Sequence, residues 1–308
     1  MVATAGNWAS LLKPGLKSIF DTVTGRPAPM LDTLFDVTDS DKSQEEYTGV
    51  GARRLPPVFT GVVQYDDIDQ YYNTAIRNYT FADGSQIERQ LVEDDQYNTA
   101  KARVANLATA FNMASEHDAA QIFINGFTDS GTNRMGASTN GADAVGLLST
   151  AHPYSPRVTG TTQSNEGTLA LNLANLDTTI QNMQNWTDDK GQLMSVNPDI
   201  LLVPPELKRT AVQIVGDRAV WEPGSAQFDV NMFAGQLRLL VWNRLTDANA
   251  WFVIDSALAK QFLKFQWRIR PEFSMEDDFD LLVSKFRGYM RYGMGWIHWG
   301  FILGQNPS

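Results

Sequence analysis

The stretch that decides the fold is residues 93–126, EDDQYNTAKARVANLATAFNMASEHDAAQIFING, in which apolar residues recur at three- and four-residue steps. This spacing places them along one face of an α-helix. The apolar stripe consists of Tyr97, Ala100, Val104, Leu107, Phe111, Ala114, Ile122 and Phe123, with a gap near His117 and Asp118. The stripe predicts a spine helix over about residues 94–125. Its predicted core residues are Val104, Leu107, Phe111 and Ile122.

Both ends of the stretch carry residues that favour helix termini. Asp94 and Asp95 can accept hydrogen bonds from the first backbone N–H groups and lie favourably at the positive end of the helix dipole. Gly126 can adopt the left-handed conformation that ends many helices. At 1.5 Å per residue, about thirty residues give a rod of roughly 45–50 Å, which is long for a helix of a globular domain. We therefore expect the other elements to be laid across this helix.

The composition is that of a folded protein. The chain has 308 residues, of which 43% are hydrophobic and 19% charged, so it can bury one large core or two smaller ones. It has no cysteine, which excludes disulfides, thiolate zinc sites and cysteine nucleophiles. No apolar run approaches the roughly 20 residues that a membrane-spanning helix needs, so we expect no membrane partner.

The net charge argues against a surface that binds nucleic acid over its whole area. The formal charge is −10 at pH 7. Proteins that grip DNA do so by neutralising phosphates with lysine and arginine. Contact with a polyanion is therefore expected only at local basic patches.

The first 46 residues predict an arm rather than a domain. A short helix is expected over residues 8–20, followed by GRPAP and an acidic tract. Pro27 and Pro29 disfavour a regular element there. We expect residues 1–46 to form an extended arm lying on a neighbouring molecule.

Residues 47–92 favour β-structure. Residues 58–65 and 78–81 are rich in β-branched and aromatic side chains, and turns are expected at 65–73 and 82–86. The segment predicts a long hairpin with few large aliphatic side chains, and such a hairpin is not stable alone. It is a candidate for packing against another subunit.

The rest of the chain predicts an α/β unit between strand-rich segments. After the spine helix come a polar loop, a short strand at 144–150 and a second amphipathic helix near 169–183. Residues 197–255 alternate strand, helix and strands. Further strands are expected at 262–270, 287–292 and 296–303. Strands on both sides of an α/β insert indicate an α+β protein.

The sequence contains no motif for catalysis or cofactor binding. His117, His152 and His298 lack metal-ligand spacing, and we expect structural roles for them and no cofactor. Acidic clusters at 66–69, 94–95 and 276–280 read as a turn, a helix cap and a solvated loop, although paired carboxylates can also serve a hydrolase. The basic and aromatic residues of 260–292 alternate as in a half-buried sheet, which we favour over a nucleic-acid surface.

A series of short motifs resembles one known family. The motifs are Phe59-Thr60-Gly61, Tyr65-Asp66-Asp67, Tyr72, Thr74, Phe81-Ala82-Asp83-Gly84, Glu88-Arg89, Asp94-Asp95-Gln96-Tyr97-Asn98, Leu147-Leu148-Ser149-Thr150-Ala151-His152-Pro153 and Asn197-Pro198-Asp199-Ile200-Leu201-Leu202-Val203-Pro204. Their order over most of the chain resembles the major capsid protein of tailed bacteriophages, which has the Hong Kong 97 fold.

The resemblance implies a division of the chain. Residues 1–46 would be the N-terminal arm and 47–92 the extended hairpin known as the E-loop. Residues 93–195 with 257–308 would form the peripheral domain, and 196–256 the axial domain. The hairpin residues expected to contact a neighbouring subunit are Arg53, Arg54, Phe59, Tyr65, Asp66, Asp67, Tyr72, Arg77, Glu88 and Arg89.

The resemblance also implies a function without catalysis. The chain would self-assemble into pentamers and hexamers of an icosahedral virion shell, formed in the host cytoplasm. Its partners would be neighbouring capsid subunits, with scaffold, portal or decoration proteins as further candidates. Packaged DNA would be enclosed with little or no sequence-specific contact.

Two alternatives remain open at the level of the sequence. An encapsulin, a cellular nanocompartment that loads a cargo enzyme, would have the same fold. A carboxylate-dependent hydrolase is the alternative from a different class.

Some relatives cross-link through a lysine of the E-loop, but no lysine occurs between Lys42 and Lys101 in this chain.

Overall fold

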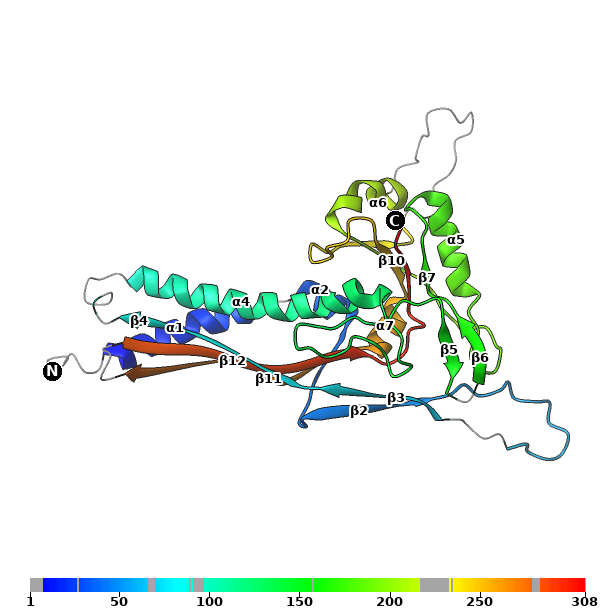
Figure 1. Cartoon of the computed structure of the whole chain (residues 1–308), viewed down its shortest axis with the longest axis horizontal. Helices are drawn as coiled ribbons and strands as arrows, with labels where there is room; N and C mark the ends of the chain where they lie inside the picture. The colour runs from blue at the N-terminus through cyan, green and yellow to red at the C-terminus, as the bar shows by residue number, and fades with distance from the viewer. Residues whose placement is uncertain are drawn as a thin grey trace, which may run out of the picture.

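The computed structural model of the chain describes residues 8–26, 28–65, 70–88, 90, 97–156, 158–216, 233, 235–278 and 283–307. Its elements are, in chain order, α1 (Trp8–Thr24), α2 (Pro29–Leu34), β1 (Asp36–Asp39), β2 (Gln44–Val50), β3 (Gln70–Arg77), β4 (Tyr79–Glu88), α4 (Tyr97–Ile124), η1 (Asn125–Phe127), β5 (His152–Ser155), β6 (Val158–Gln163), β7 (Glu166–Gly167), α5 (Leu173–Gln184), β8 (Ile200–Val203), η2 (Pro205–Leu207), α6 (Lys208–Val215), β9 (Arg238–Val241), β10 (Trp251–Ile254), α7 (Ser256–Phe262), β11 (Leu263–Asp278), β12 (Val283–Trp296) and β13 (Ile302–Gln305). Figure 1 shows a long flat part built on α4 and an upright part that carries α5 and α6.

Helix α4 runs along the flat part as one uninterrupted helix (Figure 1). Its buried face includes Ala100, Val104, Leu107, Ala108, Phe111, Ser115, Asp118, Ala119, Ala120, Ile122 and Phe123. The predicted caps Asp94 and Asp95 lie outside the described residues. The predicted left-handed exit at Gly126 is wrong, because this glycine has no positive φ and lies in the 3₁₀ turn η1. An added Cβ there would come within 3.3 Å of Leu148, so Gly126 allows close packing.

A four-stranded sheet in the order β1-β11-β12-β4 lies against α4. The strands β11 and β12 form a long antiparallel pair, and β4 pairs along β12 from Tyr79 to Glu88. Gly288 of β12 lies under the spine helix, where an added Cβ would be 2.6 Å from the ring of Phe111. Helix and sheet therefore pack in direct contact.

The pairing of β4 divides the hairpin predicted for residues 47–92. Strand β3 pairs with β2, whereas β4 belongs to the long sheet. The turn predicted at 82–86 is wrong, because these residues continue β4. Gly84 of that segment is needed for the close approach of β12, since an added Cβ would be 2.8 Å from the Phe286 carbonyl oxygen.

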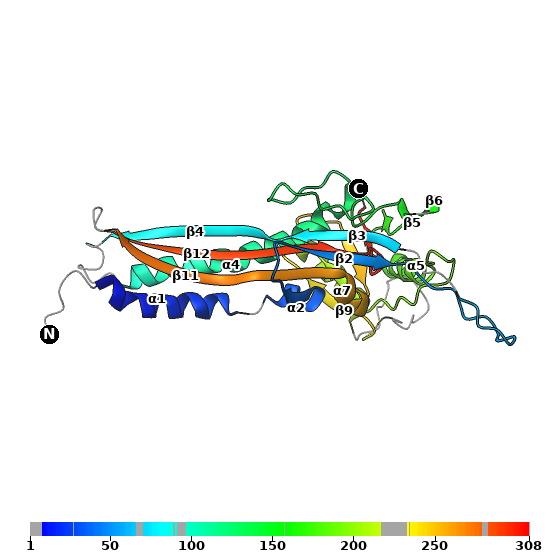
Figure 2. The same cartoon turned by 90° about the horizontal axis from the view of Figure 1, so that it is seen from below.

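The N-terminal segment is folded on its own subunit, so the prediction of an extended arm is wrong for its described part. The ring of Phe20 in α1 packs edge to face with Phe111 of α4 at 6.0 Å and lies 5.5 Å from Phe273 of β11. Asn112 donates a hydrogen bond to the Val23 carbonyl oxygen at 2.7 Å. Pro29 does not prevent a helix because it is the first residue of α2. Figure 2 shows α1 and α2 lying along β11.

The upright part is built on a five-stranded sheet in the order β7-β13-β10-β8-β9. All residues of β8 and β10 are buried, as expected for a sheet covered on both faces. The C-terminal strand β13 inserts between β10 and β7. It therefore belongs to the sheet of the predicted α/β insert and not to the long sheet.

The strand predicted at 144–150 is absent. The side chain of Asn165 takes the hydrogen bonds there: its Oδ1 accepts from the Ser149 N–H at 2.8 Å, and its Nδ2 donates to the Leu147 carbonyl at 2.8 Å. The buried side-chain amide of Asn165 thus makes hydrogen bonds that a neighbouring strand would otherwise make.

Among the helices in the described part of the chain, none has the length and apolar character needed to cross a membrane.

Candidate assembly surface

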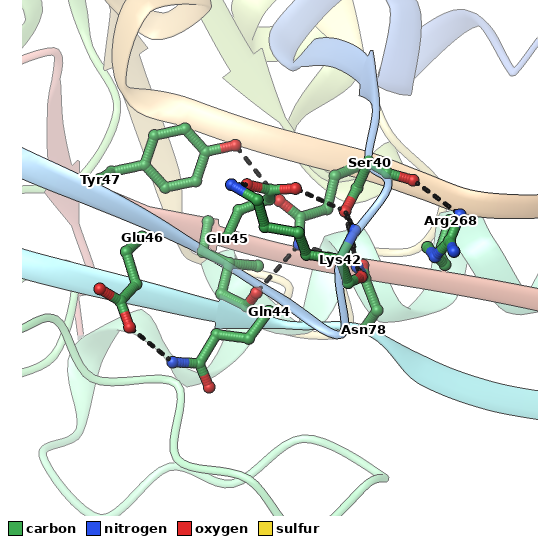
Figure 3. A network of polar contacts seen from close by, with 10 residues as sticks. Ser40, Lys42, Gln44, Glu45, Glu46, Tyr47, Asn78 and Arg268 are labelled. Carbon is green, nitrogen blue, oxygen red and sulfur yellow. Dashed lines mark hydrogen bonds and ion pairs between the residues drawn. The ribbon is translucent and has the colours of Figure 1, made fainter.

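The strands β2 and β3 form a separate two-stranded ribbon whose base is fixed by a buried polar network (Figure 3). Asn78, between β3 and β4, donates from Nδ2 to Ser40 Oγ at 2.9 Å. Gln266 of β11 donates from Nε2 to Asn78 Oδ1 at 3.0 Å and accepts at Oε1 from the Tyr47 hydroxyl at 3.2 Å. Because Ser40, Asn78 and Gln266 are buried, these hydrogen bonds fix the direction in which the ribbon leaves the body.

The loop of residues 51–65 follows β2 and projects beyond the rest of the described molecule (Figures 1 and 2). Most of the exposed large apolar side chains in the described residues lie in or beside it: Val50, Leu55, Val58, Phe59, Val62, Val63 and Tyr65. Val58 is 87% and Tyr65 90% exposed. Monomeric proteins rarely expose so contiguous an apolar patch, so this loop is a candidate docking element.

The first residues of the loop are tied to the turn that follows α5. The backbone N–H of Ala52 donates to Asp189 Oδ1 at 2.8 Å. Gln192 donates from Nε2 to the Arg53 carbonyl at 3.1 Å. The loop therefore leaves the body from a fixed position, and its apolar side chains lie beyond that point.

The structure separates the predicted contact residues into three places. Arg53, Arg54, Phe59 and Tyr65 lie on the exposed loop, Tyr72 and Arg77 on β3, and Glu88 at the far end of β4. Asp66, Asp67 and Arg89 lie outside the described residues. Glu88 pairs with Val283 in the long sheet, at the opposite end of the flat part from the loop (Figure 2).

The sequence prediction missed four apolar residues of the loop, Leu55, Val58, Val62 and Val63. For the three valines, the signal was the run of apolar residues after Pro56-Pro57, but residues 58–65 were assigned to a strand. No strand forms there, because no partner strand lies beside this part of the described chain.

The four residues predicted for the spine-helix core lie in one buried cluster. Val104, Leu107, Phe111 and Ile122 are all at most 7% exposed. Asp118, in the predicted gap of the stripe, is also buried and accepts hydrogen bonds from Arg134 and Tyr292. The gap is therefore a buried polar position.

The three histidines have different surroundings. His117 is exposed beside Asp118. His152 contacts Asp143 Oδ2 through Nδ1 at 2.8 Å and donates from Nε2 to the Leu147 carbonyl at 3.3 Å. His298 accepts a hydrogen bond at Nδ1 from Gly300, and its burial among aromatic rings lowers its pKa to about 4. In the described part of the chain, no three histidine or acidic residues are grouped as a metal site.

Comparison with protein families gives one match that covers most of the chain. Residues 72–303 match the sequence model of a family described as phage capsid protein. No curated protein matches the chain in sequence.

Solved structures with the same fold cover nearly the whole chain. A virus-like particle from Pyrococcus furiosus is similar with a TM-score of 0.57 and 10% identity, over 95% of this chain and 98% of that one. The procapsid of bacteriophage JBD30 has a TM-score of 0.53 and 15% identity, over 98% of this chain and 76% of that one. The mature capsid of bacteriophage PhiM1 has a TM-score of 0.54 and 13% identity, over 89% and 85%.

Proposed function

This chain belongs to the phage capsid protein family, and from that membership we propose how its subunits hold one another in the shell. It is a phage major capsid protein with an α+β fold of the Hong Kong 97 type, and it forms the icosahedral shell of the virion. The family consists of structural proteins, so the hydrolase alternative is set aside, and the family match favours a phage shell over a cellular nanocompartment.

The loop of residues 51–65 joins neighbouring subunits in the pentamers and hexamers of this shell. The observation that carries the proposal is the group of apolar side chains on this loop that the subunit itself leaves exposed. Burying apolar surface stabilises association by about 25 cal/mol per Å² before the costs of association are counted. A closed shell repeats the same contact many times, so a modest gain per loop is sufficient.

The division of the chain into arm, E-loop, peripheral domain and axial domain follows the helices and strands, with two changes of boundary. The E-loop comprises β2, the loop and β3, because β4 is a strand of the peripheral domain. The axial domain of residues 196–256 includes β13 in its sheet. The described part of the arm before β2 lies on its own peripheral domain through α1 and through Phe35, which follows α2.

The charge of −10 supports a container whose wall does not adhere to its contents. Like charges repel, so DNA is enclosed with little sequence-specific contact. Portal, scaffold and decoration proteins remain partners implied by the family and not by particular residues of this chain.

The test replaces residues 53–65 with a Gly-Ser linker of similar length. This change leaves β2, β3 and the polar network at their base in place. We expect soluble subunits that unfold cooperatively but form no shells, measured by circular dichroism, light scattering and negative-stain microscopy. Closed shells from this variant would overturn the proposal.

A milder variant tests whether assembly needs the apolar side chains of the loop or only its length. Val58, Phe59, Val62 and Val63 are changed to serine, which removes the exposed apolar surface and keeps the chain length. The matched control changes Met113 and Val212 to serine, because these side chains are also exposed but lie on α4 and α6. The loop variant should fail to assemble, and the control variant should still form shells.

A further inference from the structure

A groove of about 630 Å³ lies beside the part of the β2–β3 ribbon that leads into the loop. Its walls come from β2, the turn at residues 187–189, the end of α7 and residues 297–299. The aromatic residues that line it are Tyr47, Tyr71, Tyr154, Phe262 and Trp299. Grooves walled by aromatic rings accept extended, proline-rich segments, which need no hydrogen bonds of their own to hold their shape.

Three carboxylates also line this groove: Glu46, Asp188 and Asp189. None of the ion pairs formed between described residues includes them. The lysine of the groove, Lys264, is bound to Asp36 at 2.6 Å. The charge offered to a ligand is therefore negative, and it suits an arginine or lysine side chain.

Trp299 supplies a second and independent observation. Its side chain is 3% exposed, and its Nε1–H has no hydrogen-bond partner in the described structure. An unsatisfied buried donor costs free energy, and a polyproline II segment presents free carbonyl oxygens that can accept such a bond.

The chain itself contains a segment with matching chemistry, Arg53-Arg54-Leu55-Pro56-Pro57. It combines two exposed arginines, an exposed leucine and two prolines that restrict the backbone to an extended form. Residues 46–52 border their own groove, but residues 53–65 of the loop do not. The loop thus leaves its own groove before the matching segment begins.

We propose that the groove receives the Arg53–Pro57 segment of a second copy of this chain, which docks in a polyproline II conformation. The prolines and Leu55 then lie on the aromatic rings, and the arginines face Glu46, Asp188 and Asp189. The inference rests on the proposed role of the loop in assembly and names its receptor. Because each subunit offers one loop and one groove at different positions, the contact is head to tail, which is the kind of contact that builds a ring when the rotation between subunits closes.

Charge removal tests the groove without disturbing its hydrogen bonds. The variant Glu46→Gln, Asp188→Asn, Asp189→Asn keeps an acceptor oxygen where Gln44, Gln192 and Ala52 donate. The protein concentration needed for half-assembly should rise about tenfold. A charge-matched control, Glu116→Gln, Asp177→Asn, Glu206→Gln, should leave it unchanged. Assembly of the groove variant at the wild-type concentration would overturn the proposal.

Cross-linking locates the contact in shells of the full chain. Because the chain has no cysteine, Leu55→Cys and Thr48→Cys subunits can be co-assembled and oxidised without side reactions. A dimer band should appear in mixed shells, and it should be absent when Thr48→Cys is mixed with Met113→Cys. Mixed shells that close normally without the Leu55–Thr48 dimer would also overturn the proposal.

The results distinguish this inference from the one on which it rests. If the chain with residues 53–65 replaced still closes shells, the role of the loop in assembly fails. If that chain does not assemble but the groove variant assembles normally, the loop is required and docks elsewhere. Only the receptor assigned here is then wrong.

Discussion

Tyr292 of β12 donates a hydrogen bond of 2.5 Å to Asp118 of α4, inside the contact between the spine helix and the long sheet. Arg134 donates to the other oxygen of the same carboxylate at 2.5 Å. Asp118 and Tyr292 are both fully enclosed. Burial, followed by the charge of Asp118, raises the pKa of Tyr292, so its hydroxyl remains a donor. A buried carboxylate thus joins helix, sheet and loop.

The Tyr292→Phe variant should lower the free energy of unfolding by about 1–3 kcal/mol, because a buried carboxylate loses one of its donors. The ring itself stays, with its stacking on Phe81 and Phe265. Chemical denaturation of unassembled subunits measures the effect. Tyr289→Phe, on the other face of β12, is the control, and equal effects for the two would contradict a specific role for the Tyr292 hydroxyl.

Two neighbouring positions of α4 should both lose stability, one when its side chain is made smaller and the other when it is made larger. Leu107→Ala should cost about 2–5 kcal/mol because it opens a cavity. Ala108 is fully buried, so Ala108→Leu should cost about 1–3 kcal/mol by overpacking. Thr109→Ala on the exposed face should change the unfolding midpoint little. An unmoved midpoint for Ala108→Leu would show that the helix is placed wrongly on the sheet.

Mature shells should contain no isopeptide bond from the loop. Residues 43–100 hold no lysine, so the loop has no side-chain amine to react. Boiled shells should run on a denaturing gel as one band at 34.3 kDa. A ladder that withstands boiling and reductant would disprove this expectation.

Acid should destabilise the subunit partly through His298. Its pKa is lowered from 6.5 to about 4 by burial first and by His152 second, while Asp143 opposes the shift. Between these pH values the unfolded chain binds a proton at this position and the folded chain does not, so stability falls as pH drops from 6.5 to 4. In His298→Gln the melting temperature should fall less over this interval, and in the control His117→Gln it should fall as in the wild type. Identical pH profiles for all three proteins would refute the assignment.

The elements that the sequence predicted well are marked by patterns within a few neighbouring residues. The stripe of α4 is a local pattern, and so are the buried strands β8 and β10. The role of Asp118 was not predictable, because its partners Arg134 and Tyr292 lie 16 and 174 residues away. Without knowledge of those partners, a single acidic residue within an apolar stripe is expected to face solvent.

The errors in the hairpin have the same physical origin. Asp83-Gly84 favours a turn locally, but pairing with β12 over the length of β4 outweighs that preference. Residues 58–65 have strand-like composition and find no strand to pair with in the described chain. For the candidate surface, the sequence indicated the segment but not which of its side chains are exposed, since exposure depends on where the ribbon base is fixed.

The position of β13 sets the order in which the subunit can mature during synthesis. The sheet of the axial domain needs this strand between β7 and β10, yet β13 follows the other four strands of that sheet in the chain and leaves the ribosome after them. Nascent chains therefore expose an open sheet until β13 has emerged, and the sheet is complete only from that point. Protease pulses on ribosome-bound chains should cut this region until residue 305 has emerged. Timing of this kind would keep incomplete subunits out of a growing lattice.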